Sequence, residues 1–543
     1  MKRILMSAAV AAMLAGLAPV GTVQAQHMAS LDRGAADAAL AAIGLGANRN
    51  PNISWERADF RRGTYTFTNL VVHVPGGSAA DEADLPEGKP AIDESDLRPP
   101  RDIHVARMVL DSPRLDDAGG LLLHAFSLED ILIEDSDGQV EISRIAIEAP
   151  NAIMSAELGL VLSGQSSDDF DAHWDDYRFG LVAMDGFVAA FTADEGPAAF
   201  SLDRFALAEN GDDMLGRFEM LGLAFEGPSD EGPIRMALAE FSADGLATGA
   251  YSSVMDAATA GASQGDITAA YYDASMANDM KVADQVRLAG LNVTVPGIAI
   301  TLDELAATMD VRGDILTSHT HLGSLQIRPE GDSPVAAEFA AGIGMLGYDH
   351  LDIGFEANSR YDSEAGRMVT AGENHLTLRD GLRIEFTQDI GGYLEYIASM
   401  REFAINTSDD EDAAAPDPGM LLDAMAPLII HRFGMRLIDQ SILERSLAAG
   451  ASTQGITAEE MRAQASLLVG VGLMSAPPAV SRPMLAQIAT AISSFINEGG
   501  SLDITLEPPQ GLTVGEIAEI GKSETIDFDA LGLTVTAQPP AGD

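Results

Sequence analysis

A serine framed by glycines is the first residue whose surroundings suggest chemistry. The segment GASQG, residues 261–265, fits the Gly-x-Ser-x-Gly elbow that presents a nucleophilic serine in hydrolases. That elbow needs a buried strand before the serine, whereas the preceding SVMDAATA is rich in small residues and is typical of a helix. Because a chain rich in Gly, Ala and Ser produces such matches by chance, we do not assign Ser263 as a nucleophile.

Two further segments carry residue types that bind metals. SHTHLGS places His319 and His321 two residues apart, so on a strand they would share one face and could bind a metal together. DDFDAHWDDY gathers a dense cluster in one loop, formed by Asp171, His173, Asp175 and Asp176. Neither spacing is specific, and we favour paired surface histidines and a solvated acidic loop. We therefore expect no catalytic residue, no metal site and no cofactor, and the ligand-binding residues remain unassigned.

The acidic turns of the chain resemble calcium loops only at their start. DSDG at 135–138 lacks the third acidic ligand before its glycine and the glutamate at the twelfth position of an EF-hand. ENGDD at 209–213 fails for the same reason. Both segments are expected to be polar turns between strands.

The composition excludes several partners. The chain has 83 acidic against 32 basic residues, a formal net charge of −51. Nucleic acid is excluded because phosphate contacts require a basic surface, and attraction to anionic lipid headgroups is disfavoured. The acidity indicates solubility in a salty environment or, as the alternative, binding of divalent cations. The chain contains no cysteine, so no disulfide framework supports an exported form and its stability depends on buried apolar surface.

The first 25 residues have the order of a secretory signal peptide. Lys2 and Arg3 precede an apolar run at 4–17, and the small-residue triplet Val-Gln-Ala at 23–25 is typical of a cleavage site. We expect a cleavable signal peptide and a periplasmic or secreted mature protein. Residues 463–481 carry no charge, but Pro477 and Pro478 with several Gly and Ser favour buried helices over a membrane span. We expect no transmembrane span in the mature chain.

Short alternating segments predict a mainly β protein with a helical C-terminal segment. FSLEDILIEDSDG (126–138) is echoed by FSLDRFALAENGDD (200–213) and by FSADGLATGA (241–250), each an apolar run followed by a Gly-containing turn. Because no long helical pattern separates these runs, we expect an elongated, curved antiparallel sheet, or more than one, built from repeated hairpins.

The changes of pattern divide the chain as follows. We expect a signal peptide at 1–25, an N-terminal β-rich unit at 26–250, a helical or irregular excursion at 251–285, a second β-rich unit at 286–405, an acidic linker at 406–419, a helical segment at 420–500 and C-terminal strands at 501–543. LVVHVPGG from Leu70 is echoed by LNVTVPGI from Leu291, which suggests that the two β-rich units are alike.

The repeated segments resemble the AsmA-like family of bacterial envelope proteins. The shared pattern is Leu-x-acid-apolar-x-apolar followed by a polar segment with glycine, as in 128–133 with Gly138 and 202–207 with Gly211. The resemblance covers about a third of the chain and transfers no functional residue. An uncleaved N-terminal anchor, which the family has, is not expected here. The C-terminal helical segment is similar to uncharacterised exported proteins.

Three functions are compatible with these patterns. The favoured one is a non-catalytic envelope protein that binds or handles a lipid or another hydrophobic ligand along an apolar sheet face, as the AsmA-like resemblance implies. The first alternative is a secreted, calcium-binding structural or surface protein, and the second is a hydrolase with an unrecognised site. The protein is therefore not expected to be an enzyme, and the oligomeric state is left open.

Overall fold

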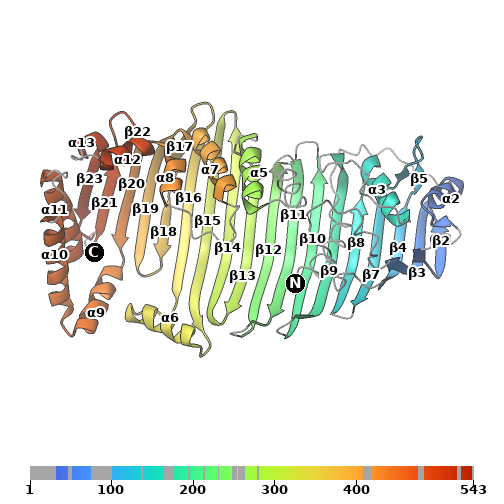
Figure 1. Ribbon diagram of the computed structural model, residues 1–543, viewed down its shortest axis with the longest axis horizontal. Helices are drawn as coiled ribbons and strands as arrows, with labels where there is room; N and C mark the ends of the chain where they lie inside the picture. The colour runs from blue at the N-terminus through green and yellow to red at the C-terminus, as the bar shows by residue number, and fades with distance from the viewer. Residues whose placement is uncertain are drawn as a thin grey trace, which may run out of the picture. The chain divides into compact units, whose positions relative to one another are not determined.

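The structure is a computed structural model that forms two compact units, Met1–Gly249 and Ala250–Asp543. It describes residues 32–46, 50, 52–74, 101–135, 138–163, 176–193, 196–211, 214–229, 232–247, 254, 263–277, 280–407, 418–474, 482–522 and 528–540. The expected signal peptide, most of the acidic linker and most of the acidic loop around His173 lie outside these residues. Figure 1 labels the elements of both units.

The first unit is built on one antiparallel sheet. Its strands are β1 (Ile53–Ser54), β2 (Arg57–Arg61), β3 (Thr64–Val74), β4 (Arg101–Asp111), β7 (Ala125–Asp135), β8 (Gly138–Glu148), β9 (Phe179–Ala193), β10 (Gly196–Asn210), β11 (Met214–Gly227) and β12 (Ile234–Ala247). From β3 to β12 each strand pairs with the next in this order, while β1 and β2 both pair with the free side of β3. A separate pair is formed by β5 (Arg114–Leu115) and β6 (Leu121–Leu122).

Two helices close one face of this sheet into a core. Helices α2 (Arg33–Ala42) and α3 (Ala152–Ser163) contribute Leu40 and Met154 to a cluster with the strand residues Phe67 and Ile142. All four side chains are less than 5% exposed. Burial on this scale is the main stabilising contribution that a chain without disulfides can make.

The long strands of the first unit share an irregularity, which we call the bulge row. Its members are Asn69, Ala106, Asp130, Ser143, Gly186, Asp203, Gly222 and Ala239, one on each of β3, β4 and β7–β12, and each is left out of the paired register. Positive φ angles at Asn69 (52°), Asp130 (51°), Gly186 (65°) and Gly222 (63°) mark every second strand of the row. Each strand of a facing pair carries one extra residue in the row, so the pairing register between the two strands is the same before and after it.

The bulge row explains the repeated FSLED-ILIED pattern. On β7, Phe126 and Leu128 precede the row and Ile131 and Ile133 follow it, and all four belong to or pack against the core cluster. Strict alternation would have placed the two pairs on opposite faces, because a shift of one residue exchanges the faces of a strand. The extra residue Asp130 restores the alternation, so both pairs face the core.

The second unit is also built from antiparallel strands. Its strands are β13 (Gln285–Val295), β14 (Gly297–Arg312), β15 (Ile315–Glu330), β16 (Leu351–Asp362), β17 (Arg367–Thr370), β18 (His375–Leu378), β19 (Leu382–Gly391), β20 (Ile429–Asp439), β21 (Ser501–Leu506), β22 (Leu512–Thr513) and β23 (Leu533–Gln538). Strands β13 to β16 pair in order, and the short β17 and β18 both lie between β16 and β19. Strand β20 then pairs with β19, β21 and β22, and β21 pairs with β23.

The helices of the second unit lie before its first strand and in the connections between its later strands. They are α5 (Gln264–Ala277), α6 (Pro334–Met345), α7 (Tyr393–Thr407), α8 (Pro418–Met425), α9 (Ile442–Gln454), α10 (Ala458–Met474), α11 (Arg482–Glu498), α12 (Val514–Lys522) and α13 (Phe528–Leu531). The Thr-x-x-Glu pattern at 457–460 predicts a capping box. It forms at the start of α10, where Glu460 accepts hydrogen bonds from the backbone N–H and hydroxyl of Thr457 at 2.8 and 2.9 Å. This bonding lowers the pKa of the Glu460 carboxyl.

The predicted fold class is confirmed, with one local correction. The described chain is mainly β, its strands pair in antiparallel hairpins, and most helices lie in its C-terminal part. Within the helical segment expected at 420–500, the apolar spacing of Leu437, Ile438 and Ile442 predicts a helix from Leu437. This prediction is wrong at its start, because residues 429–439 form β20 and the helix begins only at Ile442. The pattern was ambiguous over a short run, and pairing with strands on both sides decided it.

Candidate functional site

Apolar side chains form two continuous rows across the strands of the second unit, which we call the apolar strip. The first row, in register from β13 to β23, is Leu288, Leu305, Leu322, Phe355, Leu376, Ile384, Leu437, Leu502 and Ala537. The second row, from β13 to β19, is Leu291, Leu302, Leu325, Ile353, Leu378 and Leu382. Eight strand spacings separate the ends of the first row, which corresponds to about 38 Å.

The apolar strip is mostly half-buried, with two exposed members near its middle. Only Leu302 and Leu502 of its residues are fully buried, at 7% exposure each. Leu305 and Leu376 are 37% and 40% exposed, and the other members are half-buried. Contiguous exposed apolar surface is uncommon on a protein that does not bind a partner with it.

Helices cover the apolar strip at one end and along part of one side. At the β20–β23 end, Leu437 and Leu502 pack against α11 through Ile488 and Ala491. On β16, Tyr361 lies on the same face as Phe355 and is 2% exposed. Its ring contacts that of Tyr393 in α7 at 5.5 Å between centroids, and burial raises the pKa of Tyr393 to about 12, so that the phenol stays neutral.

The equivalent face of the first unit is filled. The row Leu70, Val105, Ile131, Ile142 and Phe187 continues across β3 to β9, and each of its members is less than 5% exposed. Both units carry apolar cross-strand rows, but the row from Leu70 to Phe187 is buried, whereas the strip of the second unit has exposed members at Leu305 and Leu376.

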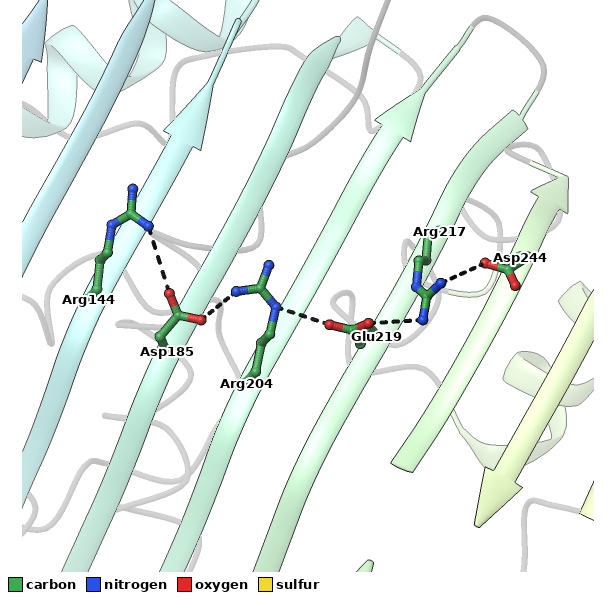
Figure 2. A network of polar contacts seen from close by, with 6 residues as sticks. All are labelled: Arg144, Asp185, Arg204, Arg217, Glu219 and Asp244. Atoms are coloured by element: carbon green, nitrogen blue, oxygen red, sulfur yellow. Dashed lines mark hydrogen bonds and ion pairs between the residues drawn. The ribbon is translucent and has the colours of Figure 1, made fainter. Parts of the chain in front are cut away.

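The opposite face of the first unit carries a ladder of alternating charges. Figure 2 shows Arg204 between Asp185, at 2.7 Å, and Glu219, at 3.0 Å. The ladder continues to Arg144 on β8 and through Arg217 to Asp244 on β12, with contacts of 3.0 to 4.0 Å. Arginines and carboxylates are equal in number among these six residues, so the ladder offers no net charge to a ligand. We interpret it as cross-strand stabilisation.

A buried carboxyl in the first unit is also structural. Glu157 of α3 accepts a hydrogen bond of 2.6 Å from the hydroxyl of Tyr177. Burial raises the pKa of Glu157, and the hydrogen bond from Tyr177 opposes that shift. Both residues are less than 8% exposed, so a substrate in solution cannot reach this carboxyl.

The structure gives Ser263 a capping role. Its hydroxyl accepts a hydrogen bond of 3.2 Å from the backbone N–H of Asp266 and donates one of 2.8 Å to the carboxylate of the same residue, at the start of α5. A strand-to-helix elbow would place a strand directly before the serine. The last described strand before Ser263 is β12, which ends at Ala247.

The two histidines of SHTHLGS lie on one face of β15 but have different neighbours. His319 Nδ1 forms a hydrogen bond of 2.9 Å with Oδ1 of Asn358, whereas His321 Nδ1 lies 4.0 Å from Oε2 of Glu356. Within the described residues, no three His, Asp or Glu side chains are arranged to hold a metal ion. Of the acidic loop, only Asp176 is described.

Sequence reasoning missed the apolar strip as a set of named residues. The alternation of Leu351, Ile353 and Phe355 in the sequence predicts one apolar face, but only for a single strand. The sequence from 286 to 386 does repeat a leucine or isoleucine at the centre of each apolar segment. Whether these side chains form one row depends on the register between the strands, which the segments do not specify.

In the comparisons with known proteins, one family model matches the C-terminal part of the chain. Residues 375–538 match a family described as "Uncharacterized protein", a segment that runs from β18 to the end of β23. No curated protein matched the chain. In the part of the chain that the structure describes, no helix is long and apolar enough to cross a membrane.

Proposed function

We propose that this chain is a non-catalytic exported envelope protein that binds a lipid-like ligand along the apolar strip of its second unit. The observation that carries the proposal is the exposure of Leu305 and Leu376 in the middle of an otherwise continuous apolar row. A hydrocarbon chain laid on this row would remove apolar area from water at about 25 cal/mol per Å².

The dimensions of the apolar strip favour acyl chains. The part of its first row that α11 leaves uncovered, from Leu288 to Ile384, crosses five strand spacings, or about 24 Å. One leaflet of a bilayer is about 15 Å of hydrocarbon, half the thickness of the core, so one acyl chain would fit on this part. The rows carry no charged residue, and their leucine and isoleucine side chains match hydrocarbon better than a polar or aromatic ligand.

A second copy of the chain is the less favourable occupant. Each chain has a formal net charge of −51, and two such chains repel one another unless salt screens them. A lipid with a neutral or zwitterionic headgroup does not meet this repulsion. The signal-peptide pattern of residues 1–25 supports an envelope location, where such lipids are present. The resemblance of the strand sequences at 128–133 and 202–207 to the AsmA-like family supports the same location.

The proposal is tested by extraction and by binding. Protein purified without detergent from bacteria that export it is extracted with organic solvent, and the extract is analysed by mass spectrometry. We expect acyl lipid in the extract and displacement of a fluorescent fatty acid in titrations. Leu305→Ser and Leu376→Ser should each weaken binding about tenfold, because one leucine contact contributes about 1.5 kcal/mol and 1.4 kcal/mol corresponds to a factor of ten.

Val188→Ser is the matched control for these variants. Val188 is 46% exposed on β9 of the first unit and lies away from the apolar strip. Its replacement should leave fatty-acid binding unchanged. An extract without lipid together with no binding of the fluorescent fatty acid would refute the proposal, as would an equal loss in Val188→Ser.

A further inference from the structure

A small hollow lies on the polar face of the sheet in the second unit, opposite the apolar strip. It encloses about 180 Å³ and is lined by residues of β15, β16 and the β18 hairpin, among them His321, Asp352, Glu356, His375 and Arg379. The alternation of β16 puts Asp352 and Glu356 on the face opposite Ile353 and Phe355. Its lining also includes Leu322 and Phe355, which are members of the apolar strip.

Glycines on two neighbouring strands create the hollow. Gly354 lies between Asp352 and Glu356 on β16 and leaves the space above it without a side chain. On β15 the pairing with β16 shifts between Leu322 and Leu325, so that Gly323 and Ser324 together oppose one residue. Such a bulge redirects side chains locally, and here it brings the ring of His321 within 3.7 Å of the Cβ position of Gly323.

The hollow carries an excess of negative charge. Asp352 is 6% exposed and accepts a hydrogen bond of 2.9 Å from the hydroxyl of Ser324. Its Oδ2 forms an ion pair of 3.0 Å with Nη1 of Arg379 but no hydrogen bond of good geometry within the described residues. Glu356 is the second carboxylate, and its Oε2 lies 4.0 Å from Nδ1 of His321. Two carboxylates thus face one guanidinium, which favours a cationic ligand.

The spacing of the two accessible acceptors distinguishes between kinds of cation. Nδ1 of His321 lies 4.0 Å from Oε2 of Glu356, and these side chains are 47% and 31% exposed. A tetrahedral zinc ion with bonds of about 2.1 Å would bring its ligand atoms to about 3.4 Å. An ammonium nitrogen at about 2.9 Å from each acceptor spans 4.0 Å without rearrangement. An ammonium group also has three N–H donors to share among such acceptors.

We propose that this hollow binds a primary ammonium group on a short stem, held between the carboxylate of Glu356 and the imidazole of His321. The buried Asp352 adds negative potential beneath it, and the ring of His375 forms the opposite wall. A volume of about 180 Å³ accommodates the ammonium group and a few carbon atoms. The group could be carried by a free amine or by an amine headgroup of a lipid.

The test compares ethanolamine with choline by calorimetric titration of the full protein. Choline has the same charge and stem but no N–H donor, so we expect ethanolamine to bind and choline to bind at least about tenfold more weakly, the factor that loss of charged hydrogen bonds gives. Equal binding of the two ligands, or saturable binding of zinc chloride in place of ethanolamine, would overturn the proposal.

Three variants locate the binding. Glu356→Gln and His321→Ala should each weaken ethanolamine binding about tenfold or more. His319→Ala is the matched control, because His319 lies on the same face of β15 and is bonded to Asn358. Thermal melts establish that all three variants fold. Unchanged affinity in Glu356→Gln, or the same loss in His319→Ala, contradicts the assignment.

Vesicles distinguish the two sources of the amine. Vesicles with ethanolamine headgroups are compared with vesicles of choline headgroups in a sedimentation assay. Binding of free ethanolamine assigns a small soluble amine, and binding of ethanolamine vesicles alone, lost in Glu356→Gln, assigns the headgroup. Binding of neither would reject the site, and it would leave the fatty-acid binding of the apolar strip unaffected.

Discussion

Replacement of Gly186 by alanine is the sharpest test of the bulge row. Gly186 has φ +65°, and a Cβ there would lie 2.3 Å from Oγ and 2.9 Å from Cβ of Ser143 on the neighbouring β8. The left-handed backbone costs an L-residue about 1–2 kcal/mol, and displacing Ser143 adds about 1–3 kcal/mol of overpacking. We therefore expect Gly186→Ala to lower the free energy of unfolding by about 2–5 kcal/mol.

The two parts of this effect can be separated within the same unit. Gly119 also has a positive φ, +89°, but no atom lies within 4 Å of its Cβ position, so Gly119→Ala should show only the backbone part. Adding Ser143→Gly to Gly186→Ala removes both clashing atoms, and a double-mutant cycle should recover the steric part.

Urea denaturation followed by tryptophan fluorescence measures these changes. Both tryptophans, Trp55 and Trp174, belong to the first unit, so the signal reports on that unit alone. The midpoint should fall with an unchanged m-value. If Gly186→Ala is no more destabilising than Gly119→Ala, or if Ser143→Gly restores nothing, the close approach in the bulge row is not a constraint and our explanation of the FSLED-ILIED pattern fails.

Two further predictions concern buried and paired charges in the first unit. Because burial raises the folded-state pKa of Glu157 above its unfolded value, its stabilising contribution is complete below about pH 4.3 and is lost as the pH rises through the folded pKa. Glu157→Gln, which stays neutral and can still accept the hydrogen bond of Tyr177, should be at least as stable as the wild type at pH 8 and less dependent on pH, and a variant that is markedly less stable at pH 8 would contradict the raised pKa. Arg204→Met should lower the free energy of unfolding by about 1 kcal/mol, since it removes two partly exposed ion pairs at the centre of the ladder, and this loss should shrink in 1 M salt, whereas a salt-independent loss would indicate packing instead.

Much of the secondary structure was accessible from local patterns. Strands β7 and β8 pair up to Asp135 and Gly138, where a polar turn is expected, and the capping box of Thr457 with Glu460 forms as its spacing predicts. Each depends on interactions between residues a few positions apart, so the chain carries the whole signal locally. The strand β20 was missed because its pairings with β19 and β21 join residues 38 to 73 positions apart in the chain, from Gly391 with Ile429 to Phe433 with Leu506.

The candidate sites were less accessible for the same reason. His319 and His321 were grouped because they are neighbours in the chain, but the hollow joins His321 to Glu356 and His375 on other strands. The burial of Asp352, which is 6% exposed, could not be predicted, because no neighbouring residue in the sequence distinguishes it from the many exposed carboxylates. Proximity across strands is set by register, which local spacing does not contain.

By itself, the sequence determined the compositional and local properties of this protein: its acidity, its lack of cysteine, its mainly β character with helices towards the C-terminus, and the repeated Phe-Ser-Leu segment as a building unit of a sheet. These follow from residue type and from spacings of two to four residues. Only the tertiary structure decided which apolar faces are covered. Phe126 and Leu202 belong to the core of the first unit and are 5% and 7% exposed, while Leu305 and Leu376 of the second unit are 37% and 40% exposed. The two sets of strands have the same alternation, and what differs is the packing of helices against them, a property of elements far apart in the chain.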